Sequence, residues 1–196
     1  REEIDRAELS INLALQGKKV VVVSSGDPGV FAMASAIFEV VDKKNISRDD
    51  LPIVVLPGIT ALLAASARLG APIGHDFCVI NLSDNLKSWD ILKSRVIAAA
   101  KADFVIAFYN PRSDSRKNQL SEIYDVLRKN CESDRIVIYA NSVSTESEAI
   151  FNTTLSEADA SSVSMKTLVI IGSSSTKKIR NTGYIYTPRY SGVEKN

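Results

Sequence analysis

Residues 20–29, Val-Val-Val-Val-Ser-Ser-Gly-Asp-Pro-Gly, decide the fold class of this chain. Four consecutive β-branched residues, preceded by two lysines and followed by a glycine-bearing turn, predict a buried strand of a parallel sheet. A helical pattern follows the turn. Residues 53–56 then predict a second strand, with an Ala/Leu-rich helix up to Leu69. This alternation of strand and helix is typical of an α/β protein whose helices connect parallel strands.

The second half of the chain predicts a mixed sheet, in which strands adjoin strands. Helices are expected at 2–16, around 89–100 and at 120–127, where apolar residues recur at helical spacing. Predicted strands lie at 77–82, 104–109, 135–140, 149–154, 167–171 and, as an edge strand, 184–189. Because two glycines and a proline interrupt residues 70–76, we expect an N-terminal α/β domain at 1–73 and a C-terminal mixed α/β domain at 74–196.

The composition disfavours several classes of function. The formal net charge is +1, without the basic excess that nucleic-acid binding usually requires. The longest apolar runs are too short to cross a bilayer, so no membrane partner is expected. Cys78 and Cys131 lie far apart and predict two buried thiols in a reducing compartment, the cytoplasm. His75 is the single histidine, so we expect no metal site built from a His/Cys cluster.

Three turns follow predicted strands at the sheet edge where α/β proteins bind ligands. In the first, residues 24–29, glycines let the backbone approach a ligand, and N–H groups at a helix start attract polar groups. The turn matches neither the dinucleotide fingerprint nor the P-loop, which disfavours those ligands. The alternative is a structural turn in which Asp27 caps the helix and Pro28 occupies its first position. On this turn alone both interpretations stay open.

The other two turns differ in what they favour. Residues 57–61 alone favour a tight strand-to-helix connection capped by Thr60, although they lie at the same sheet edge as the first turn. Residues 109–113, Tyr-Asn-Pro-Arg-Ser, follow the strongest strand pattern, and the guanidinium of Arg112 is suited to carboxylates, which favours a binding function. Residues 141–147 are interpreted mainly as an ordinary polar loop.

These segments resemble the tetrapyrrole methylase superfamily, from residue 1 to about residue 190. Residues 25–30 and 56–61 carry the motifs that are shared across the superfamily. Within it, the chain is similar to the methyltransferases that act on carbon 17 of precorrin-3B or cobalt-precorrin-3B. Residues 74–77 (Gly-His-Asp-Phe) and the turn at 109–113 point to this group. Further similar segments are 81–84, 102–105, 167–174 and 187–190.

The resemblance implies two α/β domains with S-adenosylmethionine (SAM) in the cleft between them, a carboxylate-rich tetrapyrrole as the other substrate, and a homodimer. The residues that it implies for SAM are Ser25, Gly26, Asp27, Val30, Thr60, Ala61, Tyr109, Asn141, Ser142 and Leu168. Arg112 and Arg116 are the implied partners of substrate carboxylates, by bidentate pairing.

The implied reaction is transfer of the SAM methyl group to carbon 17, coupled to contraction of the macrocycle. No catalytic acid or base is assigned, and His75 and Asp27 are the candidates for the proton transfer that contraction needs. Any cobalt would arrive in the substrate. Two alternatives remain. One is another enzyme of the superfamily, acting at a different ring carbon or on a substrate such as diphthine. The other is a non-catalytic lobe of a larger protein.

The sequence departs from the pattern of the superfamily at two places. No Gly/Pro-rich loop precedes Arg1, so we expect the first strand and loop of the N-terminal domain to be missing from this chain. After Asn141 the family tends toward Gly-Arg-Glu-Gly, whereas residues 142–147 here are Ser-Val-Ser-Thr-Glu-Ser. The backbone contacts expected at Ser142 therefore rest on position alone.

Overall fold

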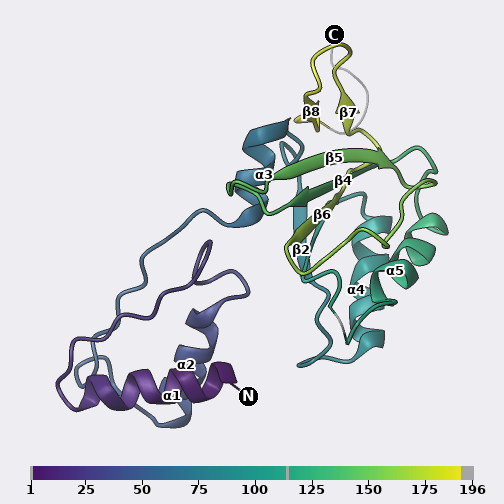
Figure 1. Ribbon diagram of the computed structural model, residues 1–196. Helices are drawn as coiled ribbons and strands as arrows, with labels where there is room; N and C mark the ends of the chain where they lie inside the picture. The colour runs from purple at the N-terminus through teal and green to yellow at the C-terminus, as the bar shows by residue number, and fades with distance from the viewer. Residues whose placement is uncertain (1, 114, 191–196) are drawn as a thin grey trace. The chain divides into compact units, whose positions relative to one another are not determined.

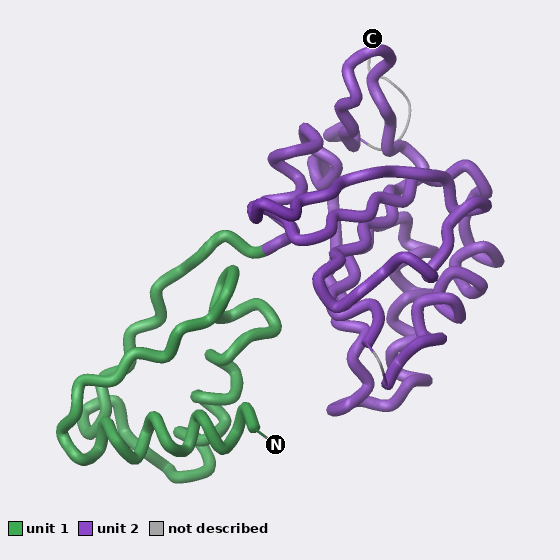
Figure 2. The backbone as a smooth tube through the Cα atoms, in the orientation of Figure 1, with its two compact units in different colours: residues 1–60 green, residues 61–196 purple. Residues whose placement is uncertain are grey.

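The computed structural model describes residues 2–113 and 115–190, and it divides into two compact units, residues 1–60 and 61–196 (Figure 2). This division differs from the predicted domain boundary between residues 73 and 74. The reason lies in helix α3 (Ala61–Leu69), whose Leu62 and Ala65 pack in the core of unit 2. The glycines and proline that suggested a boundary follow α3, whereas the boundary between the units precedes α3, because the helix packs with unit 2.

Unit 1 is built on two helices, α1 (Glu2–Leu15) and α2 (Met33–Lys43) (Figure 1). Their apolar faces meet, as the helical spacing of the sequence predicts. The residues buried between them are Ala7, Ile11, Ala36, Ile37 and Val40.

The strands predicted at 20–23 and 53–56 are wrong. Both segments belong to no strand, and Val21, Val23 and Val54 are 85%, 87% and 80% exposed. A β-branched run favours an extended backbone, but a strand also needs a hydrogen-bonded neighbour. Neither segment has such a neighbour in the described part of unit 1. Their valines therefore remain at the surface although the sequence pattern is that of a buried strand.

Unit 2 contains a five-stranded mixed sheet, in the order β2-β3-β6-β4-β5 (Figure 1). Its strands are β2 (Phe77–Asn81), β3 (Val105–Tyr109), β4 (Ile136–Asn141), β5 (Ala149–Thr154) and β6 (Thr167–Ile171). The two helices are α4 (Trp89–Lys101) and α5 (Gln119–Arg128). A smaller sheet, in the order β1-β8-β7, joins β1 (Gly70–Ala71), β7 (Lys177–Lys178) and β8 (Ile185–Tyr186). These elements confirm the predicted mixed architecture. The tail does form a strand, but β8 pairs with β1 on one side and β7 on the other, so it is the central strand of the small sheet and not the predicted edge strand.

Helices cover both faces of the five-stranded sheet. Alternate side chains of β3 point to opposite faces. Ile106 and Phe108 pack with α4 and α5, whereas Val105 and Ala107 pack with α3. Figure 1 shows α3 on the opposite side of the sheet from α4 and α5. Because both faces are covered, β3 and β6 are apolar along almost their whole length.

Three strands end at one edge of this sheet. β2 pairs parallel with β3. β3 and β4 each pair antiparallel with β6, so they run in the same direction as one another. The carboxyl ends of β2, β3 and β4 therefore lie at a single edge, which we call the carboxyl edge. Its three strand-end positions are Asn81, Tyr109 and Asn141.

Candidate functional site

In unit 1, the carboxylate of Asp27 joins the two predicted ligand turns. One oxygen accepts a hydrogen bond from the Gly29 N–H (2.8 Å) and the other from the Gly58 N–H (3.0 Å). Gly58 is 31 residues further along the chain. The turn at 24–29 and the turn at 57–60 are therefore held together by one side chain. This contact brings together Ser25, Gly26, Asp27 and Thr60, as the sequence predicts for one sheet edge, although the strands themselves are absent.

Glycine at two positions allows this close approach. A Cβ atom on Gly58 would collide with the carbonyl oxygen of Gly26. Gly26 itself has φ +72°, in the left-handed region that glycine adopts at little cost. A Cβ atom at Gly26 would lie 3.5 Å from the Cα of Thr60. The backbones of the two turns are thus in direct contact, and this contact requires glycine at position 58.

The capping interpretation of Asp27 is wrong. Helix α2 begins at Met33, and its N-cap Ala32 makes no side-chain cap. The Met33 N–H donates to Ser24 Oγ instead (3.3 Å). The hydrogen bond from Gly58, followed by that from Gly29, holds the pKa of the Asp27 carboxyl below its ordinary value of 3.8. The carboxylate is therefore ionised at neutral pH, and its bonds serve the turns rather than the helix end.

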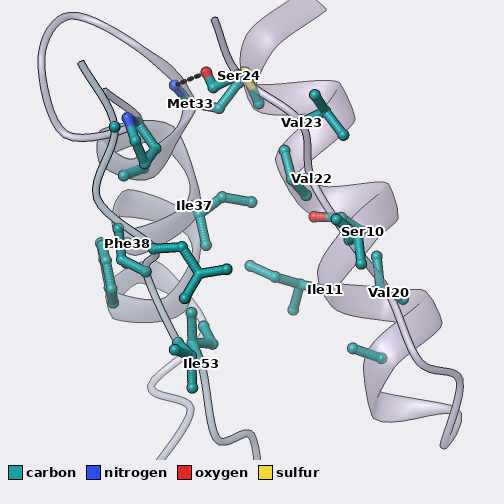
Figure 3. Close-up of a pocket in the computed structure, with 18 of the residues that line it drawn as sticks. Ser10, Ile11, Val20, Val22, Val23, Ser24, Met33, Ile37, Phe38 and Ile53 are labelled. Atoms are coloured by element: carbon teal, nitrogen blue, oxygen red, sulfur yellow. Dashed lines mark hydrogen bonds between the residues drawn. The ribbon is translucent and has the colours of Figure 1, made fainter. Parts of the chain in front are cut away.

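A cavity of about 540 Å³ lies beside these turns within unit 1 (Figure 3). Its walls are α1, α2 and the extended segments 20–24 and 51–58. Figure 3 shows Ile11, Val20, Val22, Ile37 and Ile53 directed into it. Most of the lining side chains are aliphatic, which does not suit a charged ligand. Gly26 and Gly58 reach one end of this cavity, but the Asp27 carboxylate is not among its lining residues.

In unit 2, side-chain hydrogen bonds connect the ends of β2 and β3. Asn81 Oδ1 accepts from Asn110 Nδ2 (3.1 Å) and from the Ser83 N–H (2.9 Å). Asn110 directly follows β3 and has φ +50°, a conformation that asparagine tolerates better than most residues. The polar side chains that follow two neighbouring strands are thereby fixed against one another at the carboxyl edge.

Tyr109 and Ala61 lie close together in unit 2. The backbone N–H of Leu62, in the first turn of α3, donates to the hydroxyl of Tyr109 (2.9 Å). This bond satisfies one of the N–H groups that a helix start leaves without an intrahelical acceptor. The last residue of β3 thus anchors the start of α3, and the two predicted SAM residues are neighbours.

The end of β4 is held by a second polar cluster. Asn141 Oδ1 accepts from Thr167 Oγ1 (3.2 Å), and its Nδ2 donates to Ser142 Oγ (3.3 Å). Ser142 has φ +48°, so β3 and β4 are each followed by a residue in the left-handed region. Leu168 pairs with Ala140 and is 3% exposed, so its side chain lies in the core of unit 2. Of the predicted SAM residues at this position, Asn141 and Ser142 are the accessible ones.

The two predicted substrate arginines differ in their surroundings. Arg112 Nη1 donates to the carbonyl oxygens of Ala160 (2.8 Å) and Ser161 (2.5 Å). Arg116 is 9% exposed, and its Nη1 donates to Ser83 Oγ (3.1 Å). Ser83 also bonds to Asn81, so Arg116 lies beside the carboxyl edge. The sequence predicted these two arginines but not their hydrogen-bond partners, which are Ser83 and Asn85 for Arg116 and two backbone carbonyls for Arg112.

His75 is not brought to the carboxyl edge. It precedes β2, so the length of that strand, on the order of 15 Å, separates it from Asn81 at the other end. Its Nδ1 accepts a hydrogen bond from the Asp76 N–H (2.5 Å) and lies 3.6 Å from the Asp76 carboxylate. Between the two candidates for proton transfer, the geometry favours Asp27 as the one placed at a predicted ligand turn.

The described residues contain neither a metal-binding cluster nor a membrane-spanning helix. Within residues 2–113 and 115–190, no group of three or more His, Cys, Asp or Glu side chains is arranged to hold a metal ion. In the same part of the chain, no helix is both long enough and apolar enough to span a membrane.

The fold and its polar strand ends define an α/β protein whose hydrogen-bonded turns gather at the carboxyl edge of a sheet. The family described as Tetrapyrrole (Corrin/Porphyrin) Methylases matches residues 1–159. The chain belongs to this family of methyltransferases, which confirms the resemblance and the fold class predicted from the sequence.

Individual relatives agree with the family. A Precorrin-3B C(17)-methyltransferase of Sinorhizobium sp is 47% identical over 199 residues, 100% of this chain and 78% of the relative. A Probable cobalt-factor III C(17)-methyltransferase of Salmonella typhimurium is 40% identical over 187 residues, 95% of this chain and 76% of the relative. The crystal structure of the methyltransferase CobJ matches with a TM-score of 0.89 and 47% identity, over 96% of this chain and 77% of CobJ.

Proposed function

We propose that this chain is a SAM-dependent methyltransferase of corrin synthesis that methylates carbon 17 of precorrin-3B or cobalt-precorrin-3B, with ring contraction. The observation that carries the proposal is the 47% identity, across the whole chain, to a relative named for this reaction. The second relative, named for cobalt-factor III, supports the same carbon on a cobalt-bearing substrate. Any cobalt belongs to the substrate in this proposal.

The turns of unit 1 fit the methionine and ribose end of SAM. SAM carries a positively charged ammonium group and sulfonium centre, and the Asp27 carboxylate beside them would be ionised at neutral pH. Ser25, Gly26, Val30 and Thr60 complete this set. A uroporphyrin-III C-methyltransferase of Thermus thermophilus, which shares the fold at a TM-score of 0.59 and 18% identity, is described as complexed with S-adenosylhomocysteine.

The remaining predicted contacts belong to unit 2. Tyr109 and Ala61 meet at the start of α3, and Asn141 and Ser142 offer polar side chains at the end of β4. As the resemblance implies, we assign Tyr109, Asn141 and Ser142, with Leu168, to the adenine side of SAM, and Ala61, like Thr60, to the methionine and ribose end. The buried position of Leu168 restricts its role to supporting the residues in front of it.

The methyl-transfer step itself needs little acid or base catalysis. SAM supplies an electrophilic methyl group, so the protein has to align donor and acceptor carbon and exclude water, which is mainly a positioning effect. The left-handed residues after β3 and β4, and the Asp27 link between glycine turns, fix backbone where such alignment is needed. His75 and Asp27 stay the two candidates for the proton transfer of ring contraction, although the lowered pKa of Asp27 makes its carboxylate a weak proton acceptor at neutral pH.

Calorimetric titration with S-adenosylhomocysteine tests the cofactor half of the proposal. We expect the protein to bind it, and Asp27→Ala to weaken binding more than Ser144→Ala. Ser144 lies in the loop after β4 and serves as the matched polar control. Equal effects of the two substitutions would place the cofactor elsewhere. Absence of any binding would contradict the proposal for this chain.

Identification of the methylated product tests the second half of the proposal, the tetrapyrrole acceptor and its carbon 17. Incubation with SAM and precorrin-3B or the cobalt form should give a product one methyl group heavier, with the new methyl at carbon 17 by NMR. Methylation at another carbon would favour a different enzyme of the same family. We also propose a homodimer, as the resemblance implies, and a cytoplasmic location, which the two free cysteines favour. Light scattering coupled to gel filtration should give twice the monomer mass.

A further inference from the structure

The connection between β4 and β5, residues 142–148, which we call the β4–β5 loop, contains two residues in the left-handed region. Ser142 has φ +48° and Ser144 has φ +64°. Residues other than glycine adopt this conformation at an energetic cost, and they keep it only where surrounding contacts fix it. The hydrogen bonds of these two serines therefore determine the shape of the loop.

Backbone and hydroxyl contacts fix Ser142, at the start of the loop. Its N–H donates to the carbonyl oxygen of Lys166 (2.9 Å). Its own carbonyl oxygen accepts from the N–H (3.2 Å) and from the hydroxyl (2.8 Å) of Thr145. These bonds hold the first turn of the loop but leave the N–H of Ser144 to another acceptor.

That acceptor is the carboxylate of Glu148, at the end of the loop. The Ser144 N–H donates to Glu148 Oε2 (2.6 Å), and the Glu148 N–H donates to the carbonyl oxygen of Thr145 (3.1 Å). A hydrogen bond to a carboxylate is charge-assisted and therefore stronger than one to a neutral acceptor. Removal of the carboxylate would leave Ser144 in its left-handed conformation without the bond that compensates for it.

Arg68, in the last turn of α3, orients this carboxylate. Its Nε–H donates to both oxygens of Glu148, at 3.2 and 3.3 Å, although the two residues are 80 positions apart in the sequence. Figure 1 shows α3 beside the ends of β4 and β5 that this loop connects. The side chains of Arg68 and Glu148 are 56% and 26% exposed, so the ion pair adds little stability by itself. Its effect is to direct the carboxylate toward Ser144.

The start of the loop lies at the carboxyl edge. Asn141 ends β4, and its Nδ2 donates to Ser142 Oγ (3.3 Å). Val143 is the single residue between the two left-handed serines, and it packs against the core of unit 2. A change of backbone conformation at Ser144 therefore reaches Ser142 through one residue.

We infer that Glu148, directed by Arg68, is a positioning residue for SAM binding, because it holds the β4–β5 loop in one conformation. This inference rests on the proposed function, which assigns Asn141 and Ser142 to SAM. Glu148 acts through the backbone N–H of Ser144 and not on the reacting atoms. A loop that is already ordered before binding lowers the dissociation constant, since less conformational entropy is lost when the ligand arrives.

Calorimetric titration with S-adenosylhomocysteine compares Glu148→Ala with Glu146→Ala, which removes the same charge from an exposed position of the same loop. Glu148→Ala should weaken binding by roughly 10-fold, the effect expected when about a tenth of the molecules keep the competent loop. Glu146→Ala should bind like the wild type. Arg68→Met should have a smaller effect, and combined with Glu148→Ala it should weaken binding no further, because the two residues act through one contact.

A second substitution separates positioning from direct ligand contact and from general stability. Ser144→Gly in the Glu148→Ala background should restore most of the affinity, because glycine adopts φ +64° at little cost. Glu148→Ala should raise KM for SAM, with KM for the tetrapyrrole and kcat nearly unchanged. The unfolding midpoint of unit 2, which the single tryptophan Trp89 reports, should change little.

Two results of these measurements would overturn the positioning role. If glycine fails to restore binding, Glu148 contacts the ligand itself. If the affinity falls only together with a lower unfolding midpoint, and KM for both substrates rises equally, Glu148 is a general stabilising residue of unit 2.

The outcomes also separate this inference from the proposed function. If the wild type binds S-adenosylhomocysteine and Glu148→Ala binds it equally well, the positioning role is wrong and the proposed function stands. If the wild type does not bind it, the proposed function fails for this chain and the inference fails with it. If Glu148→Ala loses affinity but the wild type methylates a carbon other than 17, the assignment of the carbon is wrong and the positioning role stands.

Discussion

At the scale of single residues, Asp27 is the group on which unit 1 depends for its candidate site. Its two oxygens hold two turns that are 31 residues apart, and both donors are backbone N–H groups. Backbone donors favour the ionised carboxylate. The pKa of Asp27 is therefore lowered, with Gly58 as the larger cause.

This pKa predicts how the turns respond to pH. Because the folded pKa lies below the ordinary 3.8, the link contributes to stability at any pH above that value and is lost as the pH falls through the folded pKa. In an NMR titration the Gly58 and Gly29 amide shifts should change with a midpoint below 3.8, and Asp27→Asn should abolish the change. A midpoint at or above 3.8 would show that the carboxylate does not bind these amides.

Gly58 provides a second test at this scale. Alanine there would place its Cβ against the Gly26 carbonyl oxygen, so the backbone of one turn has to move. We expect a loss of roughly 1–3 kcal/mol in the stability of unit 1, as for other overpacked positions, and weaker binding of S-adenosylhomocysteine. Gly29→Ala is the milder comparison, because its Cβ meets the side-chain oxygen of Asp27 at 3.2 Å. Circular dichroism and calorimetry measure the two effects.

At the scale of elements, Arg135 ties three strands together at the edge opposite the carboxyl edge. It precedes β4 and pairs with Asp103, just before β3. Asp103 also accepts from the Ser174 N–H and hydroxyl, which follow β6. Asp103→Ala leaves the Arg135 charge buried with one partner fewer, and we expect it to destabilise unit 2 by roughly 3 kcal/mol. Asp134→Ala, an exposed neighbour, should change the Trp89 unfolding midpoint little.

The elements also show how far sequence reasoning reaches. β3 and β6, with their continuous apolar runs, and α5, with apolar residues at helical spacing, are as predicted. Residues 20–23 carry an equally clear strand pattern, yet they remain extended and exposed. The pattern predicts which side chains favour burial, but a strand forms only where a neighbouring backbone provides hydrogen-bond partners. Whether such a neighbouring backbone is present depends on the tertiary structure of the unit, and the local sequence does not reveal it.

The candidate site shows the same division. The turns at 24–29, 57–60 and 109–113 were found from glycines, a proline and their places after predicted strands. The contacts that give them chemical meaning join distant residues, as Asp27 joins Gly58 and Arg116 joins Met165. One wrong interpretation, the Asp27 cap, came from a local rule that is sound by itself. Helix α2 starts only at Met33, and one oxygen of the Asp27 carboxylate is engaged with Gly58 in the other turn.

At the scale of the whole molecule, the two units differ in what they bury. Unit 2 closes both faces of a five-stranded sheet with helices, and two apolar clusters result. Unit 1 buries only a small cluster between two helices, and valines at 20–23 and 54–55 remain exposed. A 60-residue segment is already near the lower limit for a stable core, and this one leaves part of its apolar surface open.

This difference predicts that the units are unequal in autonomous stability. Residues 61–196 expressed alone should unfold cooperatively, with a Trp89 midpoint close to that of the intact chain, because both clusters and the Leu62–Tyr109 bond lie within them. Residues 1–60 alone should bind the dye ANS and melt without a sharp transition, since exposed valines and an open apolar cavity persist. A cooperative, dye-free transition for residues 1–60 would show that α1 and α2 form a sufficient core. If residues 61–196 alone do not unfold cooperatively, unit 2 needs unit 1 in order to fold. The carboxyl edge with Tyr109 and Arg116 would then not be preformed in unit 2 by itself.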